Sequence, residues 1–301
     1  MQQNTPPMNH WLISELGSSQ YLLNASQIIE IVPQADLKIS EIAGSSQSML
    51  GIADYRGHAL KVFGLRQALG LPTLEEEIGE SQKLLTEHEQ GHTNWIEELE
   101  RSVKENRSFR LATDPNQCKF GQWYNTIMND ETAMQTFCAG DPLLRILLAD
   151  FDKPHRAIHG IAQKIAQLVH ANKTDEATAI IENTRQTTLS ELLTLFGRVR
   201  RLLGESRRSV VVVLKNGHSS AGVLVDAVNM IIHIGSGEIS PLEPNSNMPK
   251  IFSGILTKHQ HLNAPTPVID THCLCGTQTP KKAPPAVTTQ ATEPTTQSAA
   301  A

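Results

Sequence analysis

Cys118-Lys-Phe-Gly-Gln-Trp-Tyr124 is the stretch of this chain that most narrows its possible fold. Two other short segments supply histidines with an apolar residue nearby in sequence: His92-Thr-Asn-Trp95 and His155-Arg-Ala-Ile-His159. The two histidines of the second segment are four positions apart and would share one face of a helix. Three imidazoles and one thiol are donors that a closed, four-coordinate zinc site accepts. We therefore predict one zinc ion, with His92, Cys118, His155 and His159 as its ligands.

The residues around these donors have the apolar spacing of helices. Apolar side chains recur every three or four positions in three stretches: Trp95, Leu99 and Val103; Ile158, Ile161, Ile165 and Leu168; Leu189, Leu192, Leu193, Phe196, Val199 and Leu203. Four antiparallel helices could bury these stripes together. Asp152 suits an N-cap and Pro154 a first helical turn, so we expect the helix of His155 and His159 to begin just before them. Another helix is expected to begin near Thr174.

Before Thr73 and after Ser206 the hydrophobic period becomes that of strands. In the first segment, apolar runs at residues 28–32 and 59–63 alternate with clusters of Gly, Ser, Pro and Asn, and a short helix is expected at residues 65–69. The pattern predicts a helical block inserted into a β domain.

The segment after the helical block predicts a hairpin. Residues 209–215 are rich in β-branched valine, Asn216-Gly217 suits a type I′ turn, and residues 221–234 resume the strand pattern. From Gly276 onward the chain is rich in Thr, Gln, Pro and Ala, so we expect a disordered tail.

The composition indicates a globular, soluble protein of about two domains, since 39% of the 301 residues are apolar. The sequence has neither the roughly 20 apolar residues of a membrane span nor a signal peptide, so we expect a cytoplasmic location without direct membrane insertion. Four cysteines are few for this length and favour thiols or metal ligands over disulfides. A net charge of -5 with interspersed signs disfavours binding to nucleic acid.

The remaining donors have simpler interpretations. His88 lies one helical turn before His92 and could compete with it as a ligand, but we expect it on the surface. Cys138 is expected to be a free thiol in a loop. Cys273-Leu-Cys275 would place two thiols on one face of the last strand. No paired donor for a second metal is obvious there beyond His272, so we predict no second metal.

The helical block resembles a known family, the chemoreceptor zinc-binding domain (CZB), whose signature is His-x-x-Trp, Cys-x-Phe-Gly-x-Trp-Tyr and His-x-x-x-His. The resemblance covers about residues 80 to 206. It implies a four-helix bundle that holds zinc (Zn²⁺) through three histidines and the cysteine, which are His92, Cys118, His155 and His159 here. The segment around Asn129 to Asp141 is longer than is usual in the family, and we expect a loop or an extra turn there.

The flanking segments resemble a second family, the CheW-like adaptor domain of bacterial chemotaxis. The resemblance lies in Gly51-Ile-Ala-Asp-Tyr-Arg56-Gly57, in Leu65-Arg66 with Leu69-Gly70-Leu71, in Gly222-Val-Leu-Val-Asp226-Ala-Val228, and in stretches at residues 239–244, 251–255 and 267–270. It implies a double five-stranded β-barrel that links receptor tips to a histidine kinase. Arg56 matches the arginine that the family places at its receptor and kinase contacts; an ordinary solvated arginine is the alternative.

The two resemblances together predict an α+β multidomain protein. The expected parts are a first adaptor part at residues 8–74, an inserted CZB domain at 75–206, a second adaptor part at 207–276 and a disordered tail at 277–301. The expected function is a cytoplasmic chemotaxis adaptor whose zinc-binding bundle senses zinc or oxidants and modulates the coupling of chemoreceptor cytoplasmic tips to a chemotaxis histidine kinase. A plain signalling scaffold with purely structural zinc is the alternative.

An enzyme is a further class that the sequence allows us to weigh. A catalytic zinc normally keeps one position open for water and has a carboxylate base nearby, as in His-Glu-x-x-His. Here Arg156 follows His155, and four protein donors would fill the coordination sphere. The sequence also lacks a glycine-rich phosphate loop and a nucleophile elbow. We predict that the protein is not an enzyme.

Overall fold

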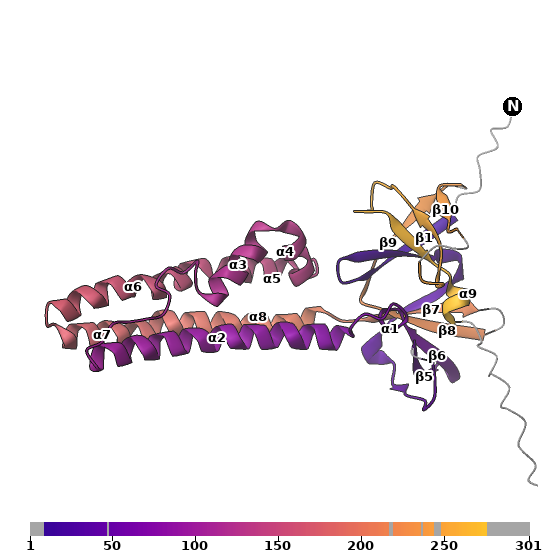
Figure 1. Cartoon of the computed structure of the whole chain (residues 1–301). Helices are drawn as coiled ribbons and strands as arrows, with labels where there is room; N and C mark the ends of the chain where they lie inside the picture. The colour runs from indigo at the N-terminus through magenta and orange to yellow at the C-terminus, as the bar shows by residue number, and fades with distance from the viewer. Residues whose placement is uncertain (1–8, 47, 217–218, 236, 244–247, 276–301) are drawn as a thin grey trace, which may run out of the picture.

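The structure is a computed structural model that describes residues 9–275 except 47, 217–218, 236 and 244–247 (Figure 1). Residues 74–206 form a long helical arm, and the residues before and after it form two β-sheets at one end of that arm. The predicted α+β class is confirmed. The tail predicted at residues 277–301 lies outside the described residues, as does Gly217 of the predicted hairpin turn.

Each of the two sheets combines strands from both sides of the helical arm. One sheet has the order β10-β11-β12-β2-β1-β9 and the other β3-β7-β8-β6-β5-β4. The strands are β1 (Asn9–Leu16), β2 (Ser19–Asn24), β3 (Ile28–Pro33), β4 (Ile39–Ser40), β5 (Met49–Tyr55), β6 (His58–Gly64), β7 (Val210–Asn216), β8 (Ser219–Val225), β9 (Ala227–Ile234), β10 (Ile239–Pro241), β11 (Phe252–Leu256) and β12 (Thr266–Ile269). The predicted pairing of β7 with β8 as a hairpin is confirmed.

The family resemblance implied five strands in each sheet, whereas each sheet of the described structure has six. In both sheets one edge strand is very short, β4 with two residues and β10 with three. Pairing is antiparallel except between β12 and β2 and between β6 and β8. Closure of the sheets into barrels stays a prediction.

Strand β7 explains the β-branched run that the sequence shows after the helical block. Val211, Val212 and Val213 are all fully buried. Val212 packs in the core that contains Phe63 and Phe252, while Val211 and Val213 point into a separate core with Leu60. A strand buried on both faces needs apolar residues at every position rather than at alternate ones.

The helical arm contains three long helical stretches and three shorter helices. They are α2 (Leu74–Lys104), α3 (Lys119–Asn129), α4 (Glu131–Cys138), α5 (Pro142–Ala149), α6 (Asp152–His170), α7 (Thr174–Thr184), a π-helical segment (Arg185–Leu189) and α8 (Ser190–Ser206). Outside the arm lie α1 (Leu65–Ala68), α9 (Thr271–Cys275) and two single 3-10 turns (Ala25–Gln27 and Gln34–Asp36). The helix predicted to begin near Thr174 is confirmed.

Local sequence sets the start of α2, and a π-helical segment joins α7 to α8. At the start of α2, Thr73 Oγ1 accepts from the backbone N–H of Glu76 at 3.1 Å and the Glu76 carboxylate accepts from the N–H of Thr73 at 2.8 Å, which is a capping box. Thr184 and Ser190, which flank the π-helical segment, both have α-helical backbone angles. The chain from α7 to α8 is therefore one continuous helix, which packs against α2.

Three local predictions about the helices were wrong. Asp152 is the first residue of α6 rather than its N-cap, because the fully buried Phe151 already has a helical conformation. The region around Asn129 to Asp141, where a loop or an extra turn was expected, contains α4, so Cys138 is a buried helical residue rather than a loop residue. Cys273 lies in α9 rather than in a strand, because the Asp270 carboxylate accepts from two N–H groups of that segment and caps a helix.

Arg66 joins the sheets to the root of the helical arm. Its side chain is 8% exposed and donates from Nε and Nη2 to the Asp226 carboxylate at 2.7 and 2.6 Å. Its Nη2 also lies 2.7 Å from Glu77 of α2, and its Nη1 donates to the carbonyl of Pro72. Arg66 precedes the arm in sequence and Asp226 follows it, so this contact fixes both arm ends against the sheets.

We predict that Arg66→Ala destabilises the protein by about 3 to 5 kcal/mol, because it leaves the largely shielded Asp226 carboxylate without its partner. The free energy of unfolding from urea denaturation of the full chain tests this. Arg145→Ala is the matched control, since Arg145 forms an exposed pair with Glu131 and such pairs contribute about 0 to 1 kcal/mol. Equal losses for the two variants would contradict the prediction.

Candidate metal centre

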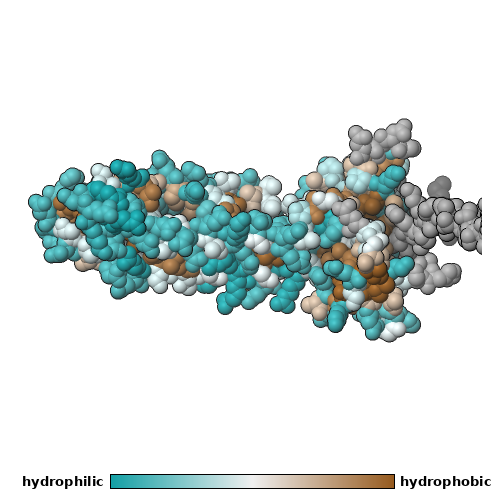
Figure 2. All heavy atoms as spheres, turned by 60° about the horizontal axis from the view of Figure 1, so that its bottom comes forward, coloured by the Kyte–Doolittle hydropathy of each residue, from teal (hydrophilic) through white to brown (hydrophobic). Residues whose placement is uncertain are grey.

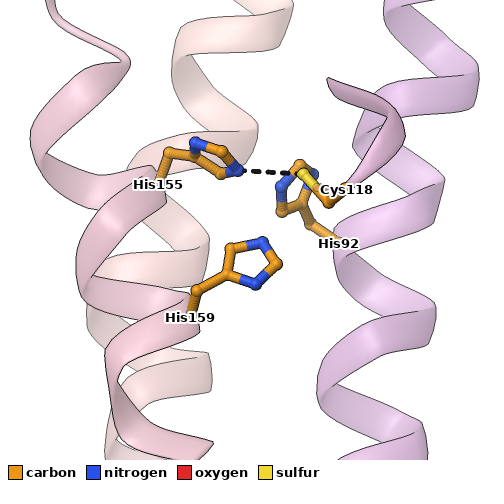
Figure 3. A group of neighbouring side chains, drawn as sticks. All are labelled: His92, Cys118, His155 and His159. Carbon is orange, nitrogen blue, oxygen red and sulfur yellow. Dashed lines mark hydrogen bonds between the residues drawn. The ribbon is translucent and has the colours of Figure 1, made fainter. Parts of the chain in front are cut away.

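The four predicted metal ligands converge inside the helical arm (Figure 3). His92 comes from α2, Cys118 lies at the start of α3, and His155 and His159 lie one turn apart on α6. One donor atom from each residue lies within 4.8 Å of the others. The histidines are buried and the cysteine is half-buried. Among the described residues this is the one such group of three or more His, Cys, Asp or Glu donors.

Cys118 is positioned by the first turn of α3. It is the N-cap of this helix, and its Sγ accepts from the backbone N–H of Gly121 at 3.2 Å. The glycine has a steric reason, because a Cβ atom at this position would lie 1.8 Å from the carbonyl oxygen of Pro115. The Cys-x-x-Gly part of the motif therefore sets a thiol on a helix N-terminus that folds tightly onto the preceding loop.

Backbone carbonyls orient two of the three imidazoles. His92 Nδ1 lies 2.8 Å from the carbonyl oxygen of His88, and His159 Nδ1 lies 3.2 Å from that of Ala112. In both rings the other nitrogen, Nε2, is buried and has no hydrogen-bond partner. A metal-binding histidine has this arrangement, since one nitrogen donates to a carbonyl and the other is free to bind the ion.

His155 completes the group through a direct contact with the cysteine. Its Nε2 lies 3.2 Å from Cys118 Sγ, the contact drawn as a dashed line in Figure 3. Its ring also meets the rings of His92 and His159 edge to face, with centroids 5.1 and 4.9 Å apart. Three imidazoles and a thiol are thus packed together with little else polar between them.

Trp95 acts on the site through the same carbonyl that orients His159. Its indole Nε1 donates to Ala112 at 2.8 Å, and its ring lies 4.9 Å from the imidazole of His159. Trp95 therefore holds the loop before α3 in the position from which the Ala112 carbonyl can orient His159. This explains the tryptophan of the His-x-x-Trp motif.

Burial keeps all three histidines neutral at pH 7. It lowers the pKa of His92 to about 4 and that of His155 to about 3, in both cases mainly because a charged imidazole would be poorly solvated there. The pKa of His159 is lowered for the same reason. Burial raises the pKa of the Cys118 thiol, opposed by N–H groups of the helix start. Neutral imidazoles are the form that binds a metal ion.

The donor set and its spacing fit zinc. Tetrahedral zinc with bonds of about 2.0 to 2.3 Å separates its donors by roughly 3.3 to 3.6 Å. The sulfur-to-nitrogen distance between Cys118 and His155 is already 3.2 Å, and all four donors lie within 4.8 Å. With three histidines and one cysteine a zinc ion would have all four positions filled by protein, as in structural sites.

Aromatic side chains surround the centre, and one of them explains an error in the sequence analysis. Phe120 is buried, with ring centroids 5.4 Å from His92 and 4.8 Å from His155. His88 was expected on the surface, but it is only 8% exposed because its ring packs against Phe120 and Trp123. Its Nε2 is buried and unpartnered. His88 does not belong to the group of four donors.

Arg56 lies far from the metal centre, in the turn between β5 and β6. Arg56 and Gly57 both have positive φ, at 53° and 78°, as a type I′ turn requires. The guanidinium is 68% exposed, pairs with Glu30 at 2.8 Å and lies over the ring of Tyr55. Ile29 and Ile31, the neighbours of Glu30 on β3, are 49% and 40% exposed. On the face seen in Figure 2, apolar residues gather over the sheets and the arm is largely hydrophilic.

The other cysteines are not near the centre. Cys138 is a buried thiol whose pKa is raised by burial to about 11, and its Sγ lies 3.5 Å from the sulfur of Met134. Cys273 is an exposed free thiol in α9. The side chain of Cys275 lies outside the described residues. Within the described part of the chain, no helix is both long enough and apolar enough to cross a membrane.

Comparison with known proteins gives two family matches. Residues 10–93 match the CheW-like domain, and residues 92–166 match the chemoreceptor zinc-binding domain. Both resemblances are thereby confirmed, and the second match includes all four predicted ligands. The chain thus carries a CheW-like domain and a chemoreceptor zinc-binding domain. Both families are non-enzymatic signalling domains, so the chain is a signalling scaffold with a zinc-binding domain, and the prediction that it is not an enzyme is confirmed.

A search of solved structures gives several matches. One of them is the scaffolding protein TtCheW from Thermoanaerobacter tengcongensis, at 12% sequence identity and a TM-score of 0.40, with 90% of this chain and 95% of that chain covered. No curated protein matches the chain.

We predict that purified wild-type protein holds about one equivalent of zinc and that His155→Ala holds almost none, because a closed zinc site needs its four protein donors. Elemental analysis after gel filtration measures the content. His170→Ala is the control, since His170 is exposed at the end of the same helix. Full zinc content in His155→Ala would contradict the assignment.

We also predict that Trp95→Phe lowers zinc affinity by about tenfold, as loss of a group that supports a ligand does. An aromatic ring is kept, whereas the N–H donor to Ala112 and part of the ring volume are lost, and the control variant below loses the same atoms elsewhere. Competition with a chromophoric chelator measures the affinity. Trp123→Phe is matched to it, because the Trp123 ring contacts His88 and Phe120 but not a predicted ligand. Equal affinities in both variants would show that the Ala112 contact does not support the site.

Proposed function

We propose that this chain is a cytoplasmic chemotaxis adaptor whose helical arm senses zinc or oxidants through a site of three histidines and one cysteine. The state of this site would modulate the coupling of chemoreceptors to a histidine kinase. The observation that carries the proposal is the convergence of four donors within 4.8 Å in a chain that also carries a CheW-like domain.

The proposal includes the division of the chain. Residues 8–74 and 207–276 form one adaptor domain with two barrels, and residues 75–206 form an inserted four-helix bundle. Sheets that combine strands from both sides of the arm support the first assignment. Packing of α2 against α3, α7 and α8, and of α6 against α7 and α8, supports the second. In this division α4 and α5 are additions to the bundle.

The cysteine is the proposed sensing atom for oxidants. A bound zinc ion would hold Cys118 as the thiolate, which is the form that oxidants attack. Hypochlorous acid transfers its OH group to this sulfur: an S–O bond forms, the O–Cl bond breaks, and the chlorine leaves as chloride. The thiolate thereby becomes a sulfenic acid. The oxidised sulfur binds metal poorly. Because Cys118 caps α3, its loss as a ligand would also loosen the start of that helix.

The proposed partner surface lies on the sheets. The exposed Arg56 is held by Glu30 and lies over the ring of Tyr55. Arginine and tyrosine are both enriched in protein interfaces, and an arginine that is already held in place loses less side-chain entropy on binding. We propose that it contacts a chemoreceptor tip or the kinase, as the family resemblance implies.

A signalling scaffold with purely structural zinc is the second candidate. The full set of four protein donors and the burial of the three histidines favour it, since structural zinc sites are closed. The half-buried position of Cys118 favours sensing, because an oxidant can reach the sulfur.

Pull-down by immobilised receptor cytoplasmic fragment and histidine kinase separates the two candidates. We predict that zinc-loaded protein differs from chelated or hypochlorite-treated protein by about fivefold or more in partner binding, the lower end of typical coupling between sites. Cys118→Ala should lose the response to hypochlorite, whereas Cys273→Ser, which removes an exposed thiol elsewhere, should keep it. Equal binding in all three states, with circular dichroism unchanged, would leave the structural candidate.

A further inference from the structure

The end of α4 is tied to the root of the helical arm by one arginine. Arg207, just after α8, donates from Nη2 to the carbonyl oxygens of Thr136 and Phe137 at 2.8 and 2.5 Å. These carbonyls belong to the last turn of α4, where helices have unpaired acceptors. The Arg207 side chain is only 6% exposed. Helix α4 is thus held at the junction between the arm and the sheets.

The same guanidinium begins a chain of charged contacts that reaches the sheets. Arg207 Nη1 lies 3.3 Å from Glu77 of α2, and Glu77 lies 2.7 Å from Arg66. Arg66 in turn binds Asp226, between β8 and β9, and Asp226 accepts from the backbone N–H of Gly17 at 2.7 Å. Glu77 and Asp226 are 32% and 13% exposed, so the chain is largely shielded from solvent.

The other end of this connection is the metal centre. Cys118 begins α3, and Asp130 both ends α3 and caps α4, its carboxylate accepting from Thr132 and Ala133. Because a single residue joins the two helices, a shift of α3 at the cysteine moves the end of α4. Helices α3 and α4 also pack on each other through Trp123 and Phe137. Cys118 is thus linked to Arg207 by two short, coupled helices.

We propose that Arg207 is the positioning residue that carries the state of the His/Cys site to the adaptor domain, through α4 and through Glu77, Arg66 and Asp226. The inference rests on the proposed function and deepens it by naming the route. It differs from the direct route along α2 and α8, which the covalent chain also offers. Movement of the α4 carbonyls withdraws two acceptors from Arg207, and the guanidinium then competes with Arg66 for Glu77.

A coupling route requires two discrete states, and the proposal assigns them as follows. With α4 in place, Arg207 is shared between the helix end and Glu77. With α4 displaced, a shielded guanidinium has lost two acceptors and must find others, because leaving it unpaired is costly. The only carboxylate it contacts among the described residues is Glu77, so the change passes to Arg66.

The Gly17 amide is the readout, because its N–H donates to Asp226 at the far end of the chain. We expect removal of zinc from the full-length wild-type protein to raise hydrogen exchange at Gly17 by about fivefold or more. In Arg207→Ala the exchange at Gly17 should be the same with and without zinc. Zinc content should stay at the wild-type value, since Arg207 touches none of the ligands. Mass spectrometry of a peptide containing Gly17 measures the exchange.

Two further variants keep the test decisive. Arg207→Lys keeps the positive charge and so guards against a folding defect. Its ammonium cannot bind the α4 carbonyls and Glu77 at the same time, as the guanidinium does. We therefore expect this variant to lose most of the zinc response. Arg208→Ala is the matched control, because Arg208 is the exposed neighbour whose guanidinium donates to the carbonyl of Glu205, and it should respond as wild type does. Circular dichroism confirms that each variant is folded.

A wild-type zinc response in folded Arg207→Ala and Arg207→Lys would overturn the inference and leave α2 and α8 as the route. An unchanged Gly17 exchange in wild type, with partner binding still dependent on zinc, would overturn it as well, while the proposed function stands. If partner binding is also independent of zinc, the proposed function itself fails.

Discussion

The parallel pairing of β6 with β8 is the constraint on which the rest of this structure depends. It joins residues 61–64, which precede the helical arm, to residues 221–224, which follow it. The two ends of a 133-residue excursion must therefore return to one place, and Arg66 with Asp226 fixes that place by a shielded ion pair. Helices α2 and α8 leave and return side by side, so the arm can be long without disturbing the sheets (Figure 1).

A second constraint acts inside the arm, where three imidazoles and a thiol are packed together. Their burial forces the histidines to be neutral, and backbone carbonyls fix two of them with Nε2 unpartnered. Unpaired buried nitrogens are costly in the absence of a ligand. Binding of a cation would remove this cost, because Nε2 of His92 and His159 would gain a partner. This energetic preference, more than any single distance, identifies the four residues as a candidate metal site.

Sequence reasoning predicted the site better than its surroundings, for reasons visible in particular residues. Donor chemistry and helical spacing were enough to bring His92, Cys118, His155 and His159 together. The Ala112 carbonyl, which orients His159, has no signal in sequence because every residue has a backbone carbonyl. His88 was placed on the surface because its spacing from His92 says nothing about Trp123, which covers it. Arg207 was missed because a basic residue after a helix is usually solvated.

The sequence by itself determined which donors could bind a metal and where the chain changes from strands to helices and back, because donor chemistry and periodicity are local properties. Only the tertiary structure decided that α6 begins after the buried Phe151 rather than after Asp152, and that residues 131–138 are helical. It also decided that Arg66 and Arg207 both contact Glu77. These outcomes depend on contacts between distant residues, such as those of Arg207 with Glu77 and Thr136, or on burial in a shared core. A local sequence pattern does not show which distant residue will shield a side chain from water or complete its hydrogen bonds.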